Sequence, residues 1–324
     1  MRAVILGLLA FGSAALAAGP APSTRPDQPV IRLGGIEYEP LGESSGVVAS
    51  RAQPGVFWTH NDSGNPPVLY AITATGKLLA EFPVRATNRD WEDISIDDQR
   101  HLYISETGNN NCRFDRIAVY RVSEPDVTPG AKAADNPLPV DRTWQLRFPG
   151  APFDCEALFV WRGYGYVISK HLDMRAATMY RFPLVDRQDR PFTLQEVGRV
   201  PIRSPVTGAD LSPDGSRLAV VTYTGPYLFR VDGDPAKACD PKNRPTSISF
   251  THPHMEAICF VPPGIRAGGT ALDGLLATCE SREVFLFPFS QFREDRPGVV
   301  DTLGGALDYL RPRSGAATRP VNGR

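Results

Sequence analysis

The sequence predicts an all-β fold, a single β-propeller of five four-stranded blades. The main observation is a short phrase that recurs five times, an acidic or small residue followed by a small residue and an apolar run. The five phrases are Glu43–Val47, Asp90–Ile94, Asp154–Leu158, Thr207–Leu211 and His254–Ile258. After each phrase the chain shows the same succession of strand patterns and turns, and amphipathic helical periodicity is nearly absent. The repeated unit is therefore expected to be one blade.

The spacing of the repeats agrees with the length of a blade. The third residues of the phrases, here called the anchors, are Ser45, Glu92, Glu156, Ala209 and Glu256, and they are 47, 64, 53 and 47 residues apart. A four-stranded blade typically takes about 40 to 50 residues. The long second step is explained by a proline-rich insertion at 124–141, between the third and fourth strands of the second blade.

Each repeat predicts its strands in a fixed order. The innermost strands are expected at Gly46–Ser50, Ile94–Ile96, Leu158–Trp161, Leu211 and Ile258–Val261. Second strands follow at Val56–His60, His101–Ser105, Tyr164–Ser169, Arg217–Thr222 and Gly274–Thr278. Third strands follow at Val68–Ile72, Ile117–Val122, Thr178–Phe182, Tyr227–Val231 and Val284–Phe289. Fourth strands are expected at Leu78–Val84, Thr143–Phe148, Leu194–Val200 and Ser247–Phe250, so the fifth blade lacks one of its own.

The missing strand is predicted to come from the N-terminal side of the repeats. Val30–Tyr38 has strand character and no blade to belong to, so we expect it to close the ring as the outer strand of the fifth blade. Closure removes the free sheet edges that otherwise invite aggregation. Gly298–Leu310 competes for this role, forms a short helix, or begins a sixth blade. The propeller domain is therefore expected to span 30–310, and the Arg-, Gly- and Pro-rich tail at 311–324 is expected to be disordered.

The beginning of the chain has the pattern of a signal peptide. Met1 and Arg2 form a positive n-region, Ala3–Leu16 an apolar h-region, and Ala15–Ala17 a small-x-small cleavage site. We therefore expect a signal peptide at 1–17, a proline-rich linker at 18–29 and a secreted or periplasmic protein. An uncleaved N-terminal anchor is the alternative. No later run is long and apolar enough for a membrane helix, so we expect no stable membrane insertion.

Composition restricts the partners. The 324 residues are 42% apolar with a formal net charge of −1, and the 31 prolines and 29 glycines fit many short strands and turns. The chain has no basic stripe, which argues against nucleic acid, and no phosphate loop or dinucleotide fingerprint. We expect a monomer that binds a small molecule or a protein.

Export permits disulfides, and Cys112 with Cys155 is the best candidate pair among five cysteines because both are predicted on one face of adjacent blades.

Two columns of polar residues are predicted to meet at one end of the tunnel. In an up-and-down blade the start of the first strand and the end of the second lie on the same face, here called the mouth. The first column contains the anchors, with Glu43, Asp90, Asp154, Thr207 and His254 two residues earlier. The second column contains Asp62, Glu106, Lys170, Tyr223 and Glu280. Blade four interrupts both columns, because it has Ala209 and Tyr223 where other blades have acids.

So many carboxylates repel one another unless a cation or backbone donors compensate them. Outside the cytoplasm the hard cation at hand is Ca²⁺, which takes six to eight oxygen ligands in irregular geometry. The expected ligands are Asp62, Glu92, Glu106, Glu156, Glu256 and Glu280. The alternative is that each anchor carboxylate accepts hydrogen bonds from backbone N–H groups of the next blade.

Further residues near the mouth are candidates for binding or catalysis. The expected ligand-binding residues are Asn61, Asn109, Trp91, Arg113 and Tyr223, although solvated loop charge and blade packing explain Arg113 and Trp91 equally well. His60, Lys170 and His171 are candidates for proton transfer. A structural or surface role is the alternative for both histidines.

Three segments resemble known families. Asp90–Ile94, Leu102–Asn109 and Ile117–Pro125 resemble secreted bacterial propellers of the SdiA-regulated family, and the repeated Glu-Ala phrases are similar to the esterase-like phytase propellers. The first resemblance implies an exported, calcium-binding propeller, and the second implies metal-assisted phosphoester cleavage. Two functions follow: a propeller that binds Ca²⁺ and a ligand or partner, or a metal-dependent hydrolase of phosphoesters or lactones.

Overall fold

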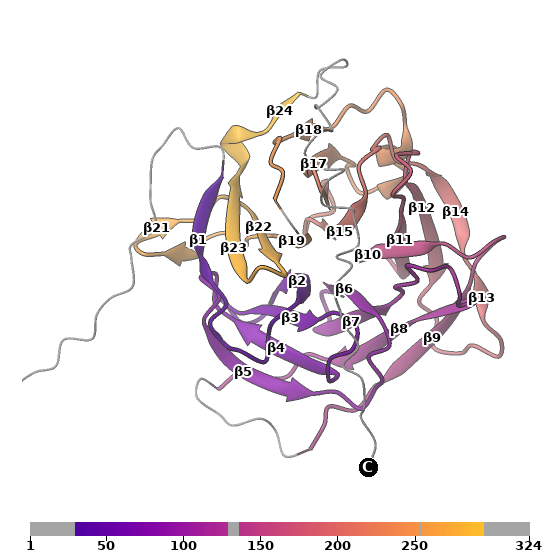
Figure 1. Cartoon of the computed structure of the whole chain (residues 1–324), viewed down its shortest axis with the longest axis horizontal. Helices are drawn as coiled ribbons and strands as arrows, with labels where there is room; N and C mark the ends of the chain where they lie inside the picture. The colour runs from indigo at the N-terminus through magenta and orange to yellow at the C-terminus, as the bar shows by residue number, and fades with distance from the viewer. Residues whose placement is uncertain (1–29, 129–135, 253, 295–324) are drawn as a thin grey trace, which may run out of the picture.

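The computed structural model describes residues 30–128, 136–252 and 254–294, and these residues form a five-bladed β-propeller (Figure 1). Blade I contains β2 (Ser44–Ala49), β3 (Phe57–Asn61), β4 (Val68–Ile72) and β5 (Leu78–Pro83). Blade II contains β6 (Trp91–Ile96), β7 (His101–Glu106), β8 (Arg116–Ser123) and β9 (Arg142–Arg147). Blade III contains β10 (Asp154–Trp161), β11 (Tyr164–Lys170), β12 (Thr178–Pro183) and β14 (Gln195–Arg199).

The last two blades are completed by segments from elsewhere in the chain. Blade IV contains β15 (Val206–Leu211), β16 (Arg217–Thr222), β17 (Gly225–Arg230) and β18 (Thr246–Ser247), with β24 (Arg293–Glu294) at its outer edge. Blade V contains β19 (Met255–Phe260), β22 (Gly274–Cys279), β23 (Glu283–Pro288) and β1 (Ile31–Gly35). Smaller elements are β13 (Phe192–Thr193), the hairpin of β20 (Arg266–Ala267) and β21 (Thr270–Ala271), and the 3₁₀ turns η1 (Pro235–Cys239) and η2 (Phe289–Gln291).

The predicted ring closure is confirmed. β1 pairs antiparallel with β23, with Ile31 opposite Leu286, so the N-terminal strand is the outer strand of blade V. Two further edge strands carry no signal in the repeat pattern: β24 extends blade IV beyond β18, and β13 runs parallel to β9 at the edge of blade II. Gly298–Leu310, the segment at 1–29 and the tail at 311–324 lie outside the described residues. Within the described part, no helix has the length and apolar character needed to cross a membrane.

The hydrophobic core lies between the blades. Alternate side chains of a strand face opposite sides of its sheet, so each blade packs one face on each neighbour. Five clusters of buried residues result, one at each junction between consecutive blades. Trp58 of β3 and Trp91 of β6, for example, are fully buried together between blades I and II. The innermost strands β2, β6, β10, β15 and β19 surround the central axis in this order (Figure 1).

Every innermost strand carries a break in register near its anchor. The breaks lie between Ser44 and Gly46, Trp91 and Ile94, Cys155 and Ala157, Val206 and Gly208, and Met255 and Ala257. A β-bulge of this kind re-aims a side chain and often lies beside a functional site. In blade IV the residue at the break is Thr207, so the anchor of that repeat lies two residues before Ala209, the residue predicted from the sequence.

The predicted disulfide between Cys112 and Cys155 is not formed in the structure. All five cysteines are free thiols. Cys155 is completely buried in the cluster between blades II and III, whereas Cys112 lies exposed in the loop after β7 with a φ of 51°. A buried thiol that packs against apolar side chains behaves as a small hydrophobic residue.

Candidate functional site

Five carboxylates from three blades form a continuous group at the mouth, here called the acidic arc. Asp62 follows β3, Asp90 precedes β6, Glu92 lies at the bulge of β6, and Asp154 and Glu156 lie at the start of β10. One oxygen each from Asp62, Asp90 and Glu92 lie within 4.8 Å of one another, and the same holds for Glu92, Asp154 and Glu156. Because Glu92 belongs to both groups, the arc joins blades I, II and III.

Gly108 supports the centre of the arc. It lies in the Glu-Thr-Gly-Asn motif after β7, and its backbone N–H donates to the carbonyl of Asp90 at 3.2 Å. The Asp90 Oδ2 and Glu92 Oε1 atoms lie so close to Gly108 that a Cβ atom there would overlap both. A larger residue at this position would displace one or both carboxylates from their positions in the arc.

Burial and mutual repulsion disfavour the charged form of the arc. Burial first, and then the charges of Asp62 and Asp154, raise the pKa of Asp90 to about 6. Burial also raises the pKa of Asp62. The pKa of Glu92 is raised well above its usual value by burial and by the neighbouring Glu156. A bound cation would reverse these shifts, because an opposite charge nearby favours the ionised carboxylate.

Lys170 supplies the only ammonium group buried at the mouth among the described residues. It lies at the end of β11, and its Nζ donates to both carboxylate oxygens of Glu156. The ring of Tyr223 lies 5.2 Å from the same Nζ. Burial by itself would lower the pKa of Lys170, but the charges of Glu156 and Glu256 hold it well above its usual value. Lys170 is therefore charged and compensates one end of the arc.

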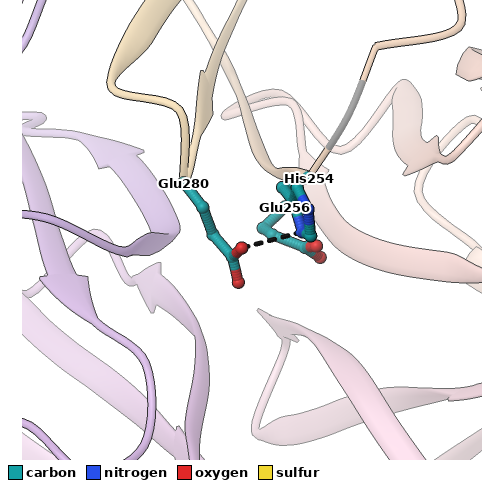
Figure 2. A group of neighbouring side chains, drawn as sticks. All are labelled: His254, Glu256 and Glu280. Atoms are coloured by element: carbon teal, nitrogen blue, oxygen red, sulfur yellow. Dashed lines mark ion pairs between the residues drawn. The ribbon is translucent and has the colours of Figure 1, made fainter. Parts of the chain in front are cut away.

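A second group, here called the rim triad, lies in blade V. It consists of His254 just before β19, Glu256 in β19 and Glu280 just after β22 (Figure 2). The His254 Nδ1 and Glu280 Oε2 atoms are 2.8 Å apart, and one ligand atom from each of the three residues lies within 4.8 Å of the other two. Burial and the charge of Glu280 raise the pKa of Glu256 to about 8, although the charge of Lys170 opposes the shift.

Of the six predicted metal ligands, Glu106 is the one that the structure leaves outside both groups. Its carboxylate accepts hydrogen bonds from the backbone N–H groups of Asp90 at 2.8 Å and Arg89 at 3.2 Å. The Arg89 guanidinium lies 3.5 Å away as well. Glu106 therefore fixes the loop before β6 within its own blade. Asp90 and Asp154 occupy the arc instead.

The two predicted asparagines also hold loops. The Asn61 amide donates to the carbonyl of Pro40 at 2.7 Å, and its oxygen accepts from the backbone N–H of Glu43 at 3.0 Å. The Asn109 amide nitrogen donates to the carbonyl of Phe114 at 3.0 Å, and its oxygen accepts from the backbone N–H of Phe114 at 3.1 Å. These contacts occupy the amide oxygens that the sequence suggested as cation ligands.

The remaining predicted residues are divided between the core and the mouth. Trp91 is fully buried, with its indole N–H donating to the carbonyl of Thr87 at 2.9 Å, so it does not reach the mouth. Arg113 is exposed on the loop after β7. Tyr223 lies at the mouth beside Lys170. His60 is completely buried against Trp91, and burial lowers its pKa to about 4, while His171 contacts the Ser169 hydroxyl at 2.8 Å.

Comparison with known proteins assigns no family to this five-bladed propeller with an acidic mouth. No protein-family model and no curated protein matches the sequence. Among solved structures, a gluconolactonase from Xanthomonas campestris is 15% identical over 80% of this chain and 79% of its own, with a TM-score of 0.39. The WD40 repeats of RRP9 are 11% identical over 85% and 99%, with a TM-score of 0.39. A catalytically inactive virginiamycin B lyase from Staphylococcus aureus is 13% identical over 75% and 64%, with a TM-score of 0.36. Likenesses this low carry no argument about activity.

Proposed function

We propose that this protein is an exported propeller that binds Ca²⁺ at the acidic arc and uses the mouth to bind a small ligand or a partner. The observation that supports it best is the chain of close carboxylate oxygens that runs from Asp62 to Glu156 through Glu92. Lys170 compensates one charge of this chain, and a bound cation would compensate the others. Ca²⁺ fits because it takes oxygen ligands at varied angles. Export rests on the signal-peptide pattern at 1–17.

Calcium binding can be tested on the purified mature chain after treatment with EDTA. Ca²⁺ at about 100 times its dissociation constant stabilises a protein by about 2.7 kcal/mol if it binds only the folded state. We expect the melting temperature to rise by several degrees in wild type and not in Asp90→Asn or Glu92→Gln. Glu196→Gln, an exposed carboxylate of β14, is the matched control and should behave as wild type. A wild-type melting curve that Ca²⁺ does not shift would contradict the proposal.

A metal-dependent hydrolase of phosphoesters or lactones is the second candidate. Asp90 favours it, since it is a partly exposed carboxylate of the arc and could accept a proton from a water molecule bound beside it. A cation in the arc would make that water more acidic and so supply the nucleophile. Chromogenic phosphoester and lactone substrates distinguish the two functions. Turnover that needs Ca²⁺ and is lost in Asp90→Asn supports the hydrolase, whereas binding without turnover supports the ligand-binding propeller.

A further inference from the structure

The rim triad differs from the acidic arc in its donor atoms. The arc offers carboxylate oxygens alone, which suit Ca²⁺. The triad offers an imidazole nitrogen from His254 together with carboxylates from Glu256 and Glu280. Imidazole is a ligand of Zn²⁺ and related transition metals, and calcium sites are built from oxygen. The two ends of the mouth therefore favour different cations.

Glu256 gives an independent indication that a ligand belongs at the triad. The residue is 7% exposed, and its carboxylate receives no hydrogen bond from any residue that the structure describes. Figure 2 shows this carboxylate beside the His254 ring, in the space that Glu280 also faces. The positive charge that most favours the ionised form of Glu256 is that of Lys170. The Lys170 ammonium, however, donates its hydrogen bonds to Glu156. Burial disfavours the charged form of this carboxylate, and a cation between the three side chains would favour it.

The backbone holds the three ligands together. The N–H of Glu280 donates to the carbonyl of His254 at 3.0 Å, so the end of β22 is tied to the start of β19. The bulge between Met255 and Ala257 turns Glu256 toward the same side. Glu256 lies in the paired strand β19, and His254 and Glu280 lie directly beside the paired strands β19 and β22, so strand pairing sets the spacing of the three ligands.

We propose that His254, Glu256 and Glu280 form a second cation site, selective for Zn²⁺ or a similar transition metal, beside the Ca²⁺ site of the acidic arc. The inference rests on the proposed function in one respect, since it adds a second cation to the same mouth. Three protein ligands leave one tetrahedral position for water or for an exchangeable ligand. The His254 side chain is 55% exposed, so this site is open to solution.

The test compares the effects of variants at the two sites on the binding of the two metals. The full mature chain is stripped with EDTA, and Zn²⁺ and Ca²⁺ are titrated separately by calorimetry. We expect wild type to bind Zn²⁺ in the presence of saturating Ca²⁺. His254→Gln and Glu280→Gln should each weaken Zn²⁺ binding by about tenfold or more and leave Ca²⁺ binding unchanged. Asp62→Asn/Asp90→Asn should have the opposite effect. Both rim positions are at least partly exposed, so their variants are expected to fold.

A matched control lies two residues away. His252 Nε2 contacts Glu283 Oε2 at 2.8 Å, the same separation as in the His254–Glu280 pair, but no third ligand atom of the described residues completes a group there. His252→Gln should therefore bind Zn²⁺ as wild type does. Co²⁺ in place of Zn²⁺ gives a second reading, since its visible absorption reports the coordination geometry of the bound ion and should be lost in His254→Gln and retained in His252→Gln.

The outcomes separate the two proposals. Absence of Zn²⁺ binding in wild type, equal Zn²⁺ affinity in wild type and His254→Gln, or displacement of Zn²⁺ by Ca²⁺ would each overturn the second site and leave the calcium proposal standing. Zn²⁺ binding that needs His254 in a protein that never binds Ca²⁺ would support the second site and contradict the calcium proposal.

Discussion

Glu92 and Asp93 are neighbours in β6, but their carboxylates belong to two different regions of the propeller. Glu92 faces the mouth, where its nearest donor is the Ser45 hydroxyl at 3.5 Å and its neighbours are other acids. Asp93 faces the interior and accepts hydrogen bonds from the backbone N–H groups of Ile94 and Leu158 at 2.8 Å and Ala209 at 3.0 Å. A carboxylate surrounded by backbone donors stabilises the fold, whereas one surrounded by carboxylates is available to a cation.

The interior pattern continues around the ring. Asp93 connects blade II to blades III and IV, and Asp210 connects blade IV to blade V by accepting from the N–H of Phe260 at 2.9 Å. The hydroxyls of Ser45 and Thr207 donate to backbone carbonyls of the following blade at 2.9 and 2.7 Å. The connection between blades is thus made by these side chains, which leaves the anchor carboxylates of blades II, III and V to the mouth.

Removing the Asp93 carboxylate should give the largest loss of stability. In Asp93→Ala three buried N–H groups lose their acceptor, and each unsatisfied donor costs about 1 to 3 kcal/mol. We expect the free energy of unfolding to fall by about 4 to 6 kcal/mol in urea denaturation, with or without Ca²⁺. Asp115→Ala, an exposed carboxylate of the same blade, is the control and should change little. A loss no greater than that of Asp115→Ala would abolish the distinction between interior and mouth.

Lys170→Met should have an intermediate effect, because Lys170 and Glu156 form an ion pair at the edge of the mouth. Breaking a buried pair from one side leaves an unpaired charge, and we expect a loss of about 3 to 5 kcal/mol. Lys170→Met/Glu156→Leu should recover most of it, since an apolar pair of similar volume replaces the charges. Urea denaturation of Lys170→Met and of Lys170→Met/Glu156→Leu measures this recovery. Equal stability of the two variants would mean that the unpaired Glu156 carboxylate has no cost, which would contradict the prediction.

The smallest effect concerns the pH dependence of the metal-free protein. The pKa of Asp90 is about 6 in the fold and 3.8 when unperturbed, so the folded state binds the proton more tightly. Its contribution to stability is therefore greatest below pH 4 and declines as the pH rises through 6. We expect Asp90→Asn to be more stable than wild type at pH 7.5, by roughly 1 kcal/mol because solvent screens this partly exposed group. The difference should disappear near pH 4 and reverse in sign on addition of saturating Ca²⁺, which stabilises wild type alone, and a difference independent of pH would contradict the assignment.

The fold could be predicted from the sequence because each blade repeats the same local pattern. The five-fold phrase, the strand order and the closing role of the segment at 30–38 all follow from periodicity and from the missing fourth strand of blade V. The anchor of blade IV could not be placed, because Thr207 and Ala209 both fit a pattern of small residues and the bulge decides between them. β13 and β24 are two residues long, too short to show a pattern.

The site could be predicted only as a set of polar residues near the mouth. Spacing brings Glu92 and Glu106 to the same end of blade II. It does not reveal that the Glu106 carboxylate accepts hydrogen bonds from the backbone N–H groups of Arg89 and Asp90. Nor does it separate Glu92 from Asp93, whose side chains differ in direction because of the bulge in β6. The hydrogen-bond partners of a carboxylate depend on the neighbouring blade, and that neighbour is absent from the local sequence.

The pairing of β1 with β23 also has a consequence for the order of folding. Arg32 and Glu283 form a side-chain contact across 251 positions of the chain, so blade V is complete only when both ends of the propeller are present. Closing a loop of this length has a high entropic cost, and contacts between distant residues slow folding. Blades I to III contain their own four strands and can form earlier. The last kinetic step is therefore expected to be the addition of β1 to blade V, and a chain stopped before that step exposes the free edge of β23.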